Sequence, residues 1–184
     1  MRKPLLLRGA RQVGKSSAVR HLGKQFKYFA EINFERHKAV KSFFQGDIDV
    51  HLIAQKISSY IQVPVEKGNT LLFLDEIQEC PEAIMALRFF KEDYPELHVI
   101  AAGSLLEFTL ENLPTFGVGR IHSLFMYPLT FDEFLVANGQ QGLMQMREMA
   151  DFMHPLDTAF HDKLIESFRI YLLVGGMPES VLAW

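Results

Sequence analysis

A glycine-rich stretch near the amino terminus contains the residue types that bind phosphate. It runs Gly9-Ala10-Arg11-Gln12-Val13-Gly14-Lys15-Ser16 and matches the P-loop pattern G-x-x-x-x-G-K-S/T. Its glycines allow a tight turn whose backbone N–H groups point at a phosphate, and the positive end of a following helix adds to the attraction. Lys15 would reach the β- and γ-phosphates of a purine nucleoside triphosphate, and the Ser16 hydroxyl would bind Mg²⁺. The residues expected to bind the nucleotide are Gly9, Ala10, Arg11, Gln12, Val13, Gly14, Lys15, Ser16 and Ser17.

Two carboxylates end an apolar run farther along the chain. The run is Leu71-Leu72-Phe73-Leu74, and Asp75 and Glu76 follow it. Asp75, with Ser16, would hold the Mg²⁺ and its hydration shell, and Glu76 would orient or deprotonate the water that attacks the γ-phosphate. A Glu directly after the Asp also favours hydrolysis over phosphoryl transfer to a small acceptor. The two stretches together therefore predict a site for a magnesium-bound nucleoside triphosphate and its hydrolysis.

Ser104 follows a third apolar run, residues 98–102, and Gly103. Its hydroxyl could sense the γ-phosphate or hold the attacking water. It could equally cap a helix, because Glu107 stands at capping-box spacing from it. The surroundings lack the G-x-S-x-G pattern, which argues against a serine hydrolase.

Strands and helices that would position these residues alternate along the chain. Strands are expected at residues 5–8, 28–34, 70–74, 98–102 and 120–126. Helices are expected at 15–26, between Asp47 or Asp49 and Pro64, from Pro81 to Tyr94-Pro95, after the capping box of Thr130 and Glu133, and at 157–174. The alternation predicts an α/β fold with a parallel sheet and helices on both faces. We expect a core over residues 1–140 and a short helical extension over 141–184.

The two middle helices each show a candidate core face. In the first of them, the apolar residues expected on the buried side are Leu52, Ile53, Ile57, Tyr60 and Ile61. In the helix that Pro81 opens, Ile84 and Leu87 would be buried, together with Met85 or Phe90.

Composition limits the classes of protein that need to be considered. The 184 residues suffice for one main domain with a small appendage. The single cysteine, Cys80, excludes an internal disulfide and a C-x-x-C pair and suits a reducing compartment. No apolar run approaches the roughly 18 residues of a membrane-spanning helix. The seven histidines lack the spacing of a zinc site. We therefore expect a soluble, cytoplasmic protein.

Positive charge is concentrated at the amino terminus. The first 30 residues contain eight Lys or Arg residues and no Asp or Glu, although the net charge of the chain is −3. Such a segment suits contact with a polyphosphate or a nucleic acid. Alternatively, Arg20, Lys24 and Lys27 form the solvated face of a helix. The sequence leaves both interpretations open.

The order and spacing of several motifs resemble an AAA-type P-loop ATPase, in particular a widespread bacterial and archaeal family with a poorly understood C-terminal domain. The motifs are residues 9–16, Leu74-Asp75-Glu76-Ile77-Gln78, Ala102-Gly103-Ser104, Gly119-Arg120, residues 128–134 and residues 175–179. The resemblance implies a five-stranded sheet ordered 5-1-4-3-2, ATP as the nucleotide and a sensor role for Ser104. It also implies that Arg120 is an arginine finger acting on a neighbouring subunit or domain. The alternatives are a solvated Arg120 at a strand edge and Arg88 in the same role.

The chain departs from that family at both ends. It starts four residues before the first expected strand, so upstream residues that often cradle adenine are absent, and it ends at Trp184, where the family continues. We expect a fragment whose missing C-terminal domain carries the specificity. Methionines at near-helical spacing would form an adaptable core or a face for such a partner, and they are Met144, Met146, Met149 and Met153.

Three functions were compared with these features. The first is an ATPase whose nucleotide cycle moves an attached or partner module, as a homo-oligomer or through the C-terminal domain. The second is a nucleotide-dependent switch or DNA-binding module that hydrolyses little. A small-molecule kinase would need an acceptor pocket and an Arg-rich lid, and the sequence shows neither.

Overall fold

The computed structural model describes residues 2–104, 106 and 119–184. The chain forms two compact units, Met1–Met126 and Tyr127–Trp184, and each is described by itself. The division comes earlier than the expected boundary after residue 140. The reason is that helix α5 (Phe131–Ala137), expected to belong to the core, packs against α6 (Gln141–Met149) and α7 (Thr158–Val174).

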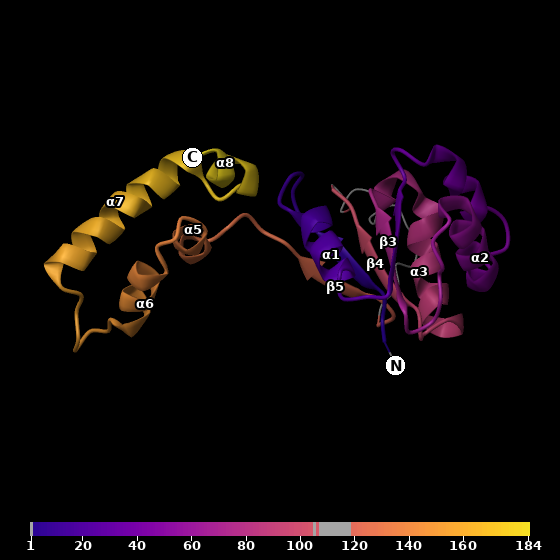
Figure 1. Cartoon of the computed structure of the whole chain (residues 1–184), viewed down its shortest axis with the longest axis horizontal. Coiled ribbons are helices and arrows are strands. Elements are labelled where there is room, and N and C mark those ends of the chain that lie inside the picture. Colours follow the sequence, from indigo (N-terminus) through magenta and orange to yellow (C-terminus); the bar gives the residue numbers. More distant parts are fainter. Residues whose placement is uncertain (1, 105, 107–118) are drawn as a thin grey trace. The chain divides into compact units, whose positions relative to one another are not determined.

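A parallel sheet of five strands forms the centre of the first unit (Figure 1). Its strands are β1 (Leu5–Arg8), β2 (Tyr28–Asn33), β3 (Thr70–Asp75), β4 (His98–Ala102) and β5 (His122–Phe125). The order across the sheet is β2-β3-β4-β1-β5, which confirms the expected order. Leu7 of β1 pairs with Ala102 of β4 on one side and with Leu124 of β5 on the other. Because the strands are parallel, the segments that follow them meet at one edge of the sheet.

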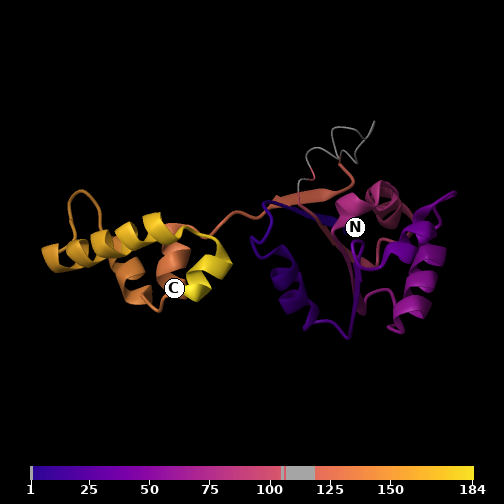
Figure 2. The same cartoon turned by 90° about the horizontal axis from the view of Figure 1, so that it is seen from above.

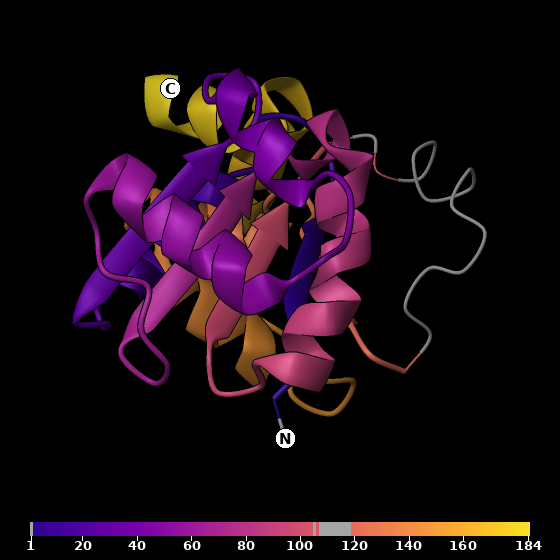
Figure 3. The same cartoon turned by 90° about the vertical axis from the view of Figure 1, so that its right-hand side faces the viewer.

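Helices cover both faces of this sheet (Figures 1 and 2). Helix α1 (Lys15–Gly23) packs on one face, where Val19 meets Leu71 and Phe73 of β3. Helices α2 (Val50–Ile61) and α3 (Pro81–Asp93) cover the other face, and the strands stand behind them in Figure 3. Leu72 and Leu74 of β3 point into that second cluster. Burial on both faces explains why β3 is apolar without alternation.

The buried face of α2 differs from the expected one. Asp49 caps the helix by accepting hydrogen bonds from the backbone N–H groups of His51 and Leu52. The buried residues are Val50, Ile53, Ala54 and Ile57, which follow helical spacing. Leu52 and Tyr60 are exposed, so their assignment to the core was wrong. They are apolar but lie outside the arc that these four residues define.

Helix α3 begins at Pro81, as expected, and buries a wider stripe. Ala83, Ile84, Ala86, Leu87 and Phe90 face the core. Phe90 therefore completes the stripe, and Met85 is exposed. In the described part of the chain, four further short helices were not predicted: η1 (Lys38–Phe44), η2 (Ile77–Glu79), α6, and α8 (Pro178–Ala183). Neither η1 nor η2 spans enough residues to show a helical repeat of apolar positions.

The second unit consists of α5, α6, α7 and α8. The expected capping box begins α5, since Thr130 Oγ accepts from the Glu133 N–H and the Glu133 carboxylate accepts from the Thr130 N–H. Phe134, Leu135, Leu164 and Val181 are buried. Met149 and Met153 are exposed and α6 buries no residue, so these methionines form no core. None of the helices in the described part of the chain is long and apolar enough to cross a membrane.

Candidate functional site

The glycine-rich loop connects β1 to α1, as the sequence predicts. Gly9 has a φ of 133° and Gly14, which caps α1, has a φ of 100°, so both adopt backbone conformations that favour glycine. Val13 is buried and anchors the middle of the loop in the core. Residues 10–12 and Ser17 are exposed. The loop therefore presents its backbone at the carboxyl end of β1, ahead of the first turn of a helix.

Lys15 folds back over this loop. Its Nζ donates hydrogen bonds to the backbone oxygens of Gly9, at 2.8 Å, and Ala10, at 2.7 Å, and the side chain is buried. The ammonium group thus already lies against the loop backbone. The acceptor oxygens of an anionic ligand would replace these carbonyl groups as partners of the Lys15 ammonium group, without requiring a movement of the helix.

Gly9 is also a point of close approach between two strands. A Cβ at this position would collide with the backbone oxygen of Met126, whose N–H donates to Arg8 O at 2.9 Å. We expect Gly9→Ala to lower the free energy of unfolding by about 2 kcal/mol or more, because strained backbone alone costs roughly 1–3 kcal/mol. Urea unfolding measures this change.

Gly68→Ala provides the matched control for this effect. Gly68 also has a positive φ, 75°, but nothing lies within 4 Å of the position of its Cβ. It should therefore show only the conformational part of the cost. Equal losses of stability in the two variants would contradict the close approach at Gly9.

Asp75 and Ser16 meet at the carboxyl edge of the sheet. Ser16 Oγ donates to the two carboxylate oxygens of Asp75, at 3.0 and 3.1 Å, and Asn33 Nδ2 donates to Oδ2 at 3.3 Å. Burial raises the pKa of Asp75, and these two hydrogen bonds oppose the shift. A buried carboxylate beside a hydroxyl is a set of hard oxygen donors, and a divalent cation would restore the ionised form that burial disfavours. The donors present therefore fit Mg²⁺.

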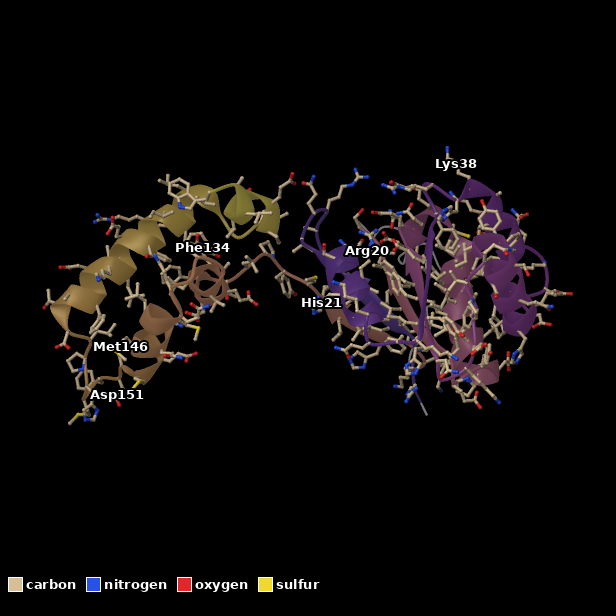
Figure 4. The ribbon with its side chains drawn as sticks, in the orientation of Figure 1. Arg20, His21, Lys38, Phe134, Met146 and Asp151 are labelled. Carbon is tan, nitrogen blue, oxygen red and sulfur yellow. The ribbon has the colours of Figure 1, made fainter. Side chains whose placement is uncertain are left out.

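Arg20 adds a cation to this edge. Its guanidinium donates to both carboxylate oxygens of Glu31, with Nη2 at 2.7 Å from Oε1 and Nε at 3.0 Å from Oε2. The hydrogen bond with Glu31 raises the pKa of Arg20. Its Nη2 also lies 4.0 Å from Asp75 Oδ2. Figure 4 shows the side chain extending from α1 toward the strands, so Arg20 belongs to the site as well as to the basic amino-terminal segment.

Glu76 follows β3 in an unusual backbone conformation. Its φ of 50° and ψ of 46° are left-handed, which is uncommon for a residue other than glycine. Its Oε2 accepts a hydrogen bond from Gln78 Nε2 at 2.6 Å. The left-handed turn redirects the chain from the strand into η2, so Glu76 remains half-buried at the edge of the sheet.

A cavity of about 790 Å³ joins these groups. Its lining residues are Arg11, Gln12, Ser16, Arg20, Glu31, Asn33, Glu35, Arg36, His37, Asp75 and Glu76. The cavity thus contains both expected metal ligands, Ser16 and Asp75, the expected base Glu76, and two further residues of the loop, Arg11 and Gln12. Its arginines and carboxylates supply both signs of charge, which suits a polyanion that arrives with a divalent cation.

Two expected catalytic residues lie elsewhere. Ser104 is buried after β4, at the same edge of the sheet, but does not line the cavity. Glu107, its expected capping partner, lies outside the described residues. Arg120 precedes β5 and therefore lies at the amino ends of the strands, where its Nε is 2.6 Å from Glu92 Oε1. Arg88 pairs with the same carboxylate, so neither arginine reaches the loop of its own chain.

Sequence reasoning assigned no role in the site to four residues that contribute to it: Asn33, Arg20, Glu31 and Gln78. Asn33 is a polar residue that ends an apolar strand, as Asp75 does, and this position could have identified it. Arg20 was considered only as part of a charged segment. Nothing in the sequence pairs Gln78 with Glu76, because their contact depends on the left-handed turn between β3 and η2.

Comparisons with known proteins agree with this architecture. A family model described as an AAA domain matches residues 1–135. The structure is similar to the structure of C. elegans PCH-2, with a TM-score of 0.54 and 12% sequence identity over 98% of this chain and 53% of that one. At this identity the likeness shows the fold alone, and the chain spans about half the length of that protein. A comparison with curated proteins gave no match.

Proposed function

Since the chain belongs to the AAA domain family of P-loop ATPases, we propose that it binds MgATP at the loop formed by residues 9–16 and hydrolyses it to drive or switch an attached or partner module. The observation that carries the proposal is the cavity in which the loop, Asp75 and Glu76 face one another. We place this activity in the cytoplasm, since the buried free thiol of Cys80 suits a reducing compartment.

Each residue of the site has a distinct role in the proposed reaction. The loop N–H groups and Lys15 bind the β- and γ-phosphates, and Ser16 and Asp75 hold Mg²⁺. When bound, the metal draws negative charge from the phosphate oxygens. Glu76 orients a water molecule and accepts its proton as that water attacks the γ-phosphorus. Ser104 contacts the γ-phosphate or the water from the end of β4.

Phosphate release by the purified chain tests the proposal. We expect Mg²⁺-dependent conversion of ATP to ADP and phosphate, with a rate per subunit that rises with protein concentration if subunits complete one another's sites. Binding of ATP without any turnover, at all concentrations, would leave only a nucleotide switch. Failure to bind MgATP would reject both functions.

Arg120 provides a test of assembly. We propose that it leaves Glu92 and stabilises the transition state in the site of a neighbouring subunit. Arg120→Ala should reduce turnover by at least about tenfold, with ATP affinity nearly unchanged. A mixture of Arg120→Ala with the binding-deficient Lys15→Ala variant should hydrolyse ATP faster than either alone, because mixed neighbours combine one intact arginine with one intact loop. Arg88→Ala is the control, since Arg88 shares the partner Glu92. No recovery on mixing would contradict action between subunits.

Nucleic-acid binding remains the weaker alternative. Arg11 and Arg20 form ion pairs with Glu35 and Glu31, which balances part of the amino-terminal charge locally. Lys38 points away from the body of the first unit in Figure 4 and is one cation available to a phosphate backbone. Retention of the chain on DNA that weakens with added salt would support this function, and no retention at low salt would reject it.

A further inference from the structure

A tight turn brings Gln78 back beside Glu76. Glu76 has left-handed backbone angles, and the next residue, Ile77, is fully buried. The Glu79 N–H donates to Glu76 O at 3.0 Å, and the Cys80 N–H donates to Ile77 O at 2.9 Å. These bonds and the buried isoleucine fix η2, so the side chains of residues 76 and 78 lie on the same side of the turn.

The orientation of the Gln78 amide follows from its partner. A carboxylate only accepts hydrogen bonds, so the atom 2.6 Å from Glu76 Oε2 must be the donor nitrogen. Gln78 Oε1 then points the other way. It is buried and has no donor among the described residues, and a Cβ on Gly103 would collide with it. The amide is therefore confined between the carboxylate of Glu76 and the backbone that follows β4.

Glu76 needs such a partner because other groups in the cavity compete for its carboxylate. Arg11, Arg20 and Arg36 line the same cavity, and an ion pair with any of them would draw Glu76 away from a water molecule. Asp75, its neighbour, repels it. A neutral amide that occupies Oε2 holds the side chain in place and leaves Oε1 to accept a proton.

We propose that Gln78 is the positioning residue for Glu76, holding its carboxylate toward the attacking water while braced against Gly103. The proposal rests on the proposed hydrolysis of ATP. The proposal also connects Gly103 and Ser104 to Glu76 through the Gln78 amide. A displacement of this backbone moves the amide that holds Glu76, so contact of Ser104 with the γ-phosphate and alignment of the base become linked.

Gln78→Met and Gln78→Glu test this role. Met has a similar length but no donor, and Glu replaces the donor with an acceptor that repels Glu76. Both variants should lower kcat by about tenfold or more, the value of one hydrogen bond to a charged group, and leave the Kd for MgATP within about twofold. Gln78→Met should unfold at the same urea concentration as the wild type or a higher one, since it removes a buried acceptor without a donor. Glu79→Gln, an exposed neighbour, is the control and should keep the wild-type kcat.

A double-mutant cycle shows whether Gln78 acts through Glu76. Adding Gln78→Met to Glu76→Gln should slow turnover no further, because the group that Gln78 positions no longer accepts a proton. Gly103→Ala should also lower kcat by displacing the amide. Its effect should be smaller in the Gln78→Ala background, where the amide is absent and only the crowding of Leu106 remains.

The possible failures can be told apart. A wild-type kcat in both Gln78 variants, or a full additional loss in the double variant, would overturn the positioning role alone. Absence of turnover in the wild type would overturn the proposed function. In that case NMR of the ¹⁵N-labelled side-chain amide of Gln78 still tests its contact with Glu76. The amide proton signals should move upfield in Glu76→Ala if the hydrogen bond exists, and they should stay in place if it does not.

Discussion

Glu76→Gln should abolish most turnover while sparing the binding of ATP. Glutamine matches the shape of glutamate, and its oxygen can still accept the hydrogen bond from Gln78, but it cannot take a proton from water. General-base catalysis contributes roughly 10²–10⁴-fold, so we expect kcat to fall by about 1,000-fold. The affinity for MgATP should change by less than about twofold, because Glu76 does not belong to the phosphate-binding loop. Phosphate release and equilibrium binding measure the two quantities separately.

The control for this variant is Glu79→Gln. It makes the same chemical change three residues away, at an exposed carboxylate whose partner is Lys41, and it should leave kcat and Kd unchanged. If Glu76→Gln kept more than half of the wild-type turnover, Glu76 would not be the base. Another residue of the cavity would then have to accept the proton.

Lys15→Ala should act on binding instead. In the bound state its ammonium group exchanges the carbonyl oxygens of Gly9 and Ala10 for phosphate oxygens. Each hydrogen bond between charged groups is worth roughly 1.5–3 kcal/mol, and two of them correspond to a loss of affinity of about 100-fold or more. Titration with MgATP measures the loss, and thermal unfolding shows whether the loop remains folded without the lysine.

Lys24→Ala is the matched control for charge. Lys24 is the exposed C-cap residue of the same helix, so its removal changes the net charge equally. Because exposed charges more than a Debye length from a ligand are largely screened, we expect little change in Kd. Similar losses in the two variants would mean that general positive charge, and not the position of Lys15, determines affinity.

Local patterns predicted the sheet well. All five strands form, and the order across the sheet is the one expected from the resemblance. Strands buried on both faces, such as β3, show as continuous apolar runs, and Gly14 and Pro81 mark where helices begin. The loop, Asp75 and Glu76 could also be placed because each lies at or directly after the end of a strand, and parallel strands bring such positions to one edge.

Features that depend on long-range packing could not be predicted. Leu52 and Tyr60 are apolar like their buried neighbours, and the positions of η1 and α3 determine which side of α2 is covered. The contact of Asn33 with Asp75 needs β2 and β3 to pair in register. The ion pair of Arg120 with Glu92 joins the start of β5 to the end of α3. In each case the deciding partner is remote in the chain.

The position of β1 between β4 and β5 affects how the phosphate-binding loop can form. Leu5 pairs with Ile100 on one side and with His122 on the other, so the first strand of the chain has neighbours only from its later part. During synthesis, residues 9–16 would leave the ribosome long before the strands that hold them in place. Such nonlocal pairing slows folding. Before β4 has been synthesised, β1 lacks this partner strand, and we expect the loop of residues 9–16 not to be folded for nucleotide binding. Ligand binding is thus acquired only late in folding, when the sheet closes around its first strand.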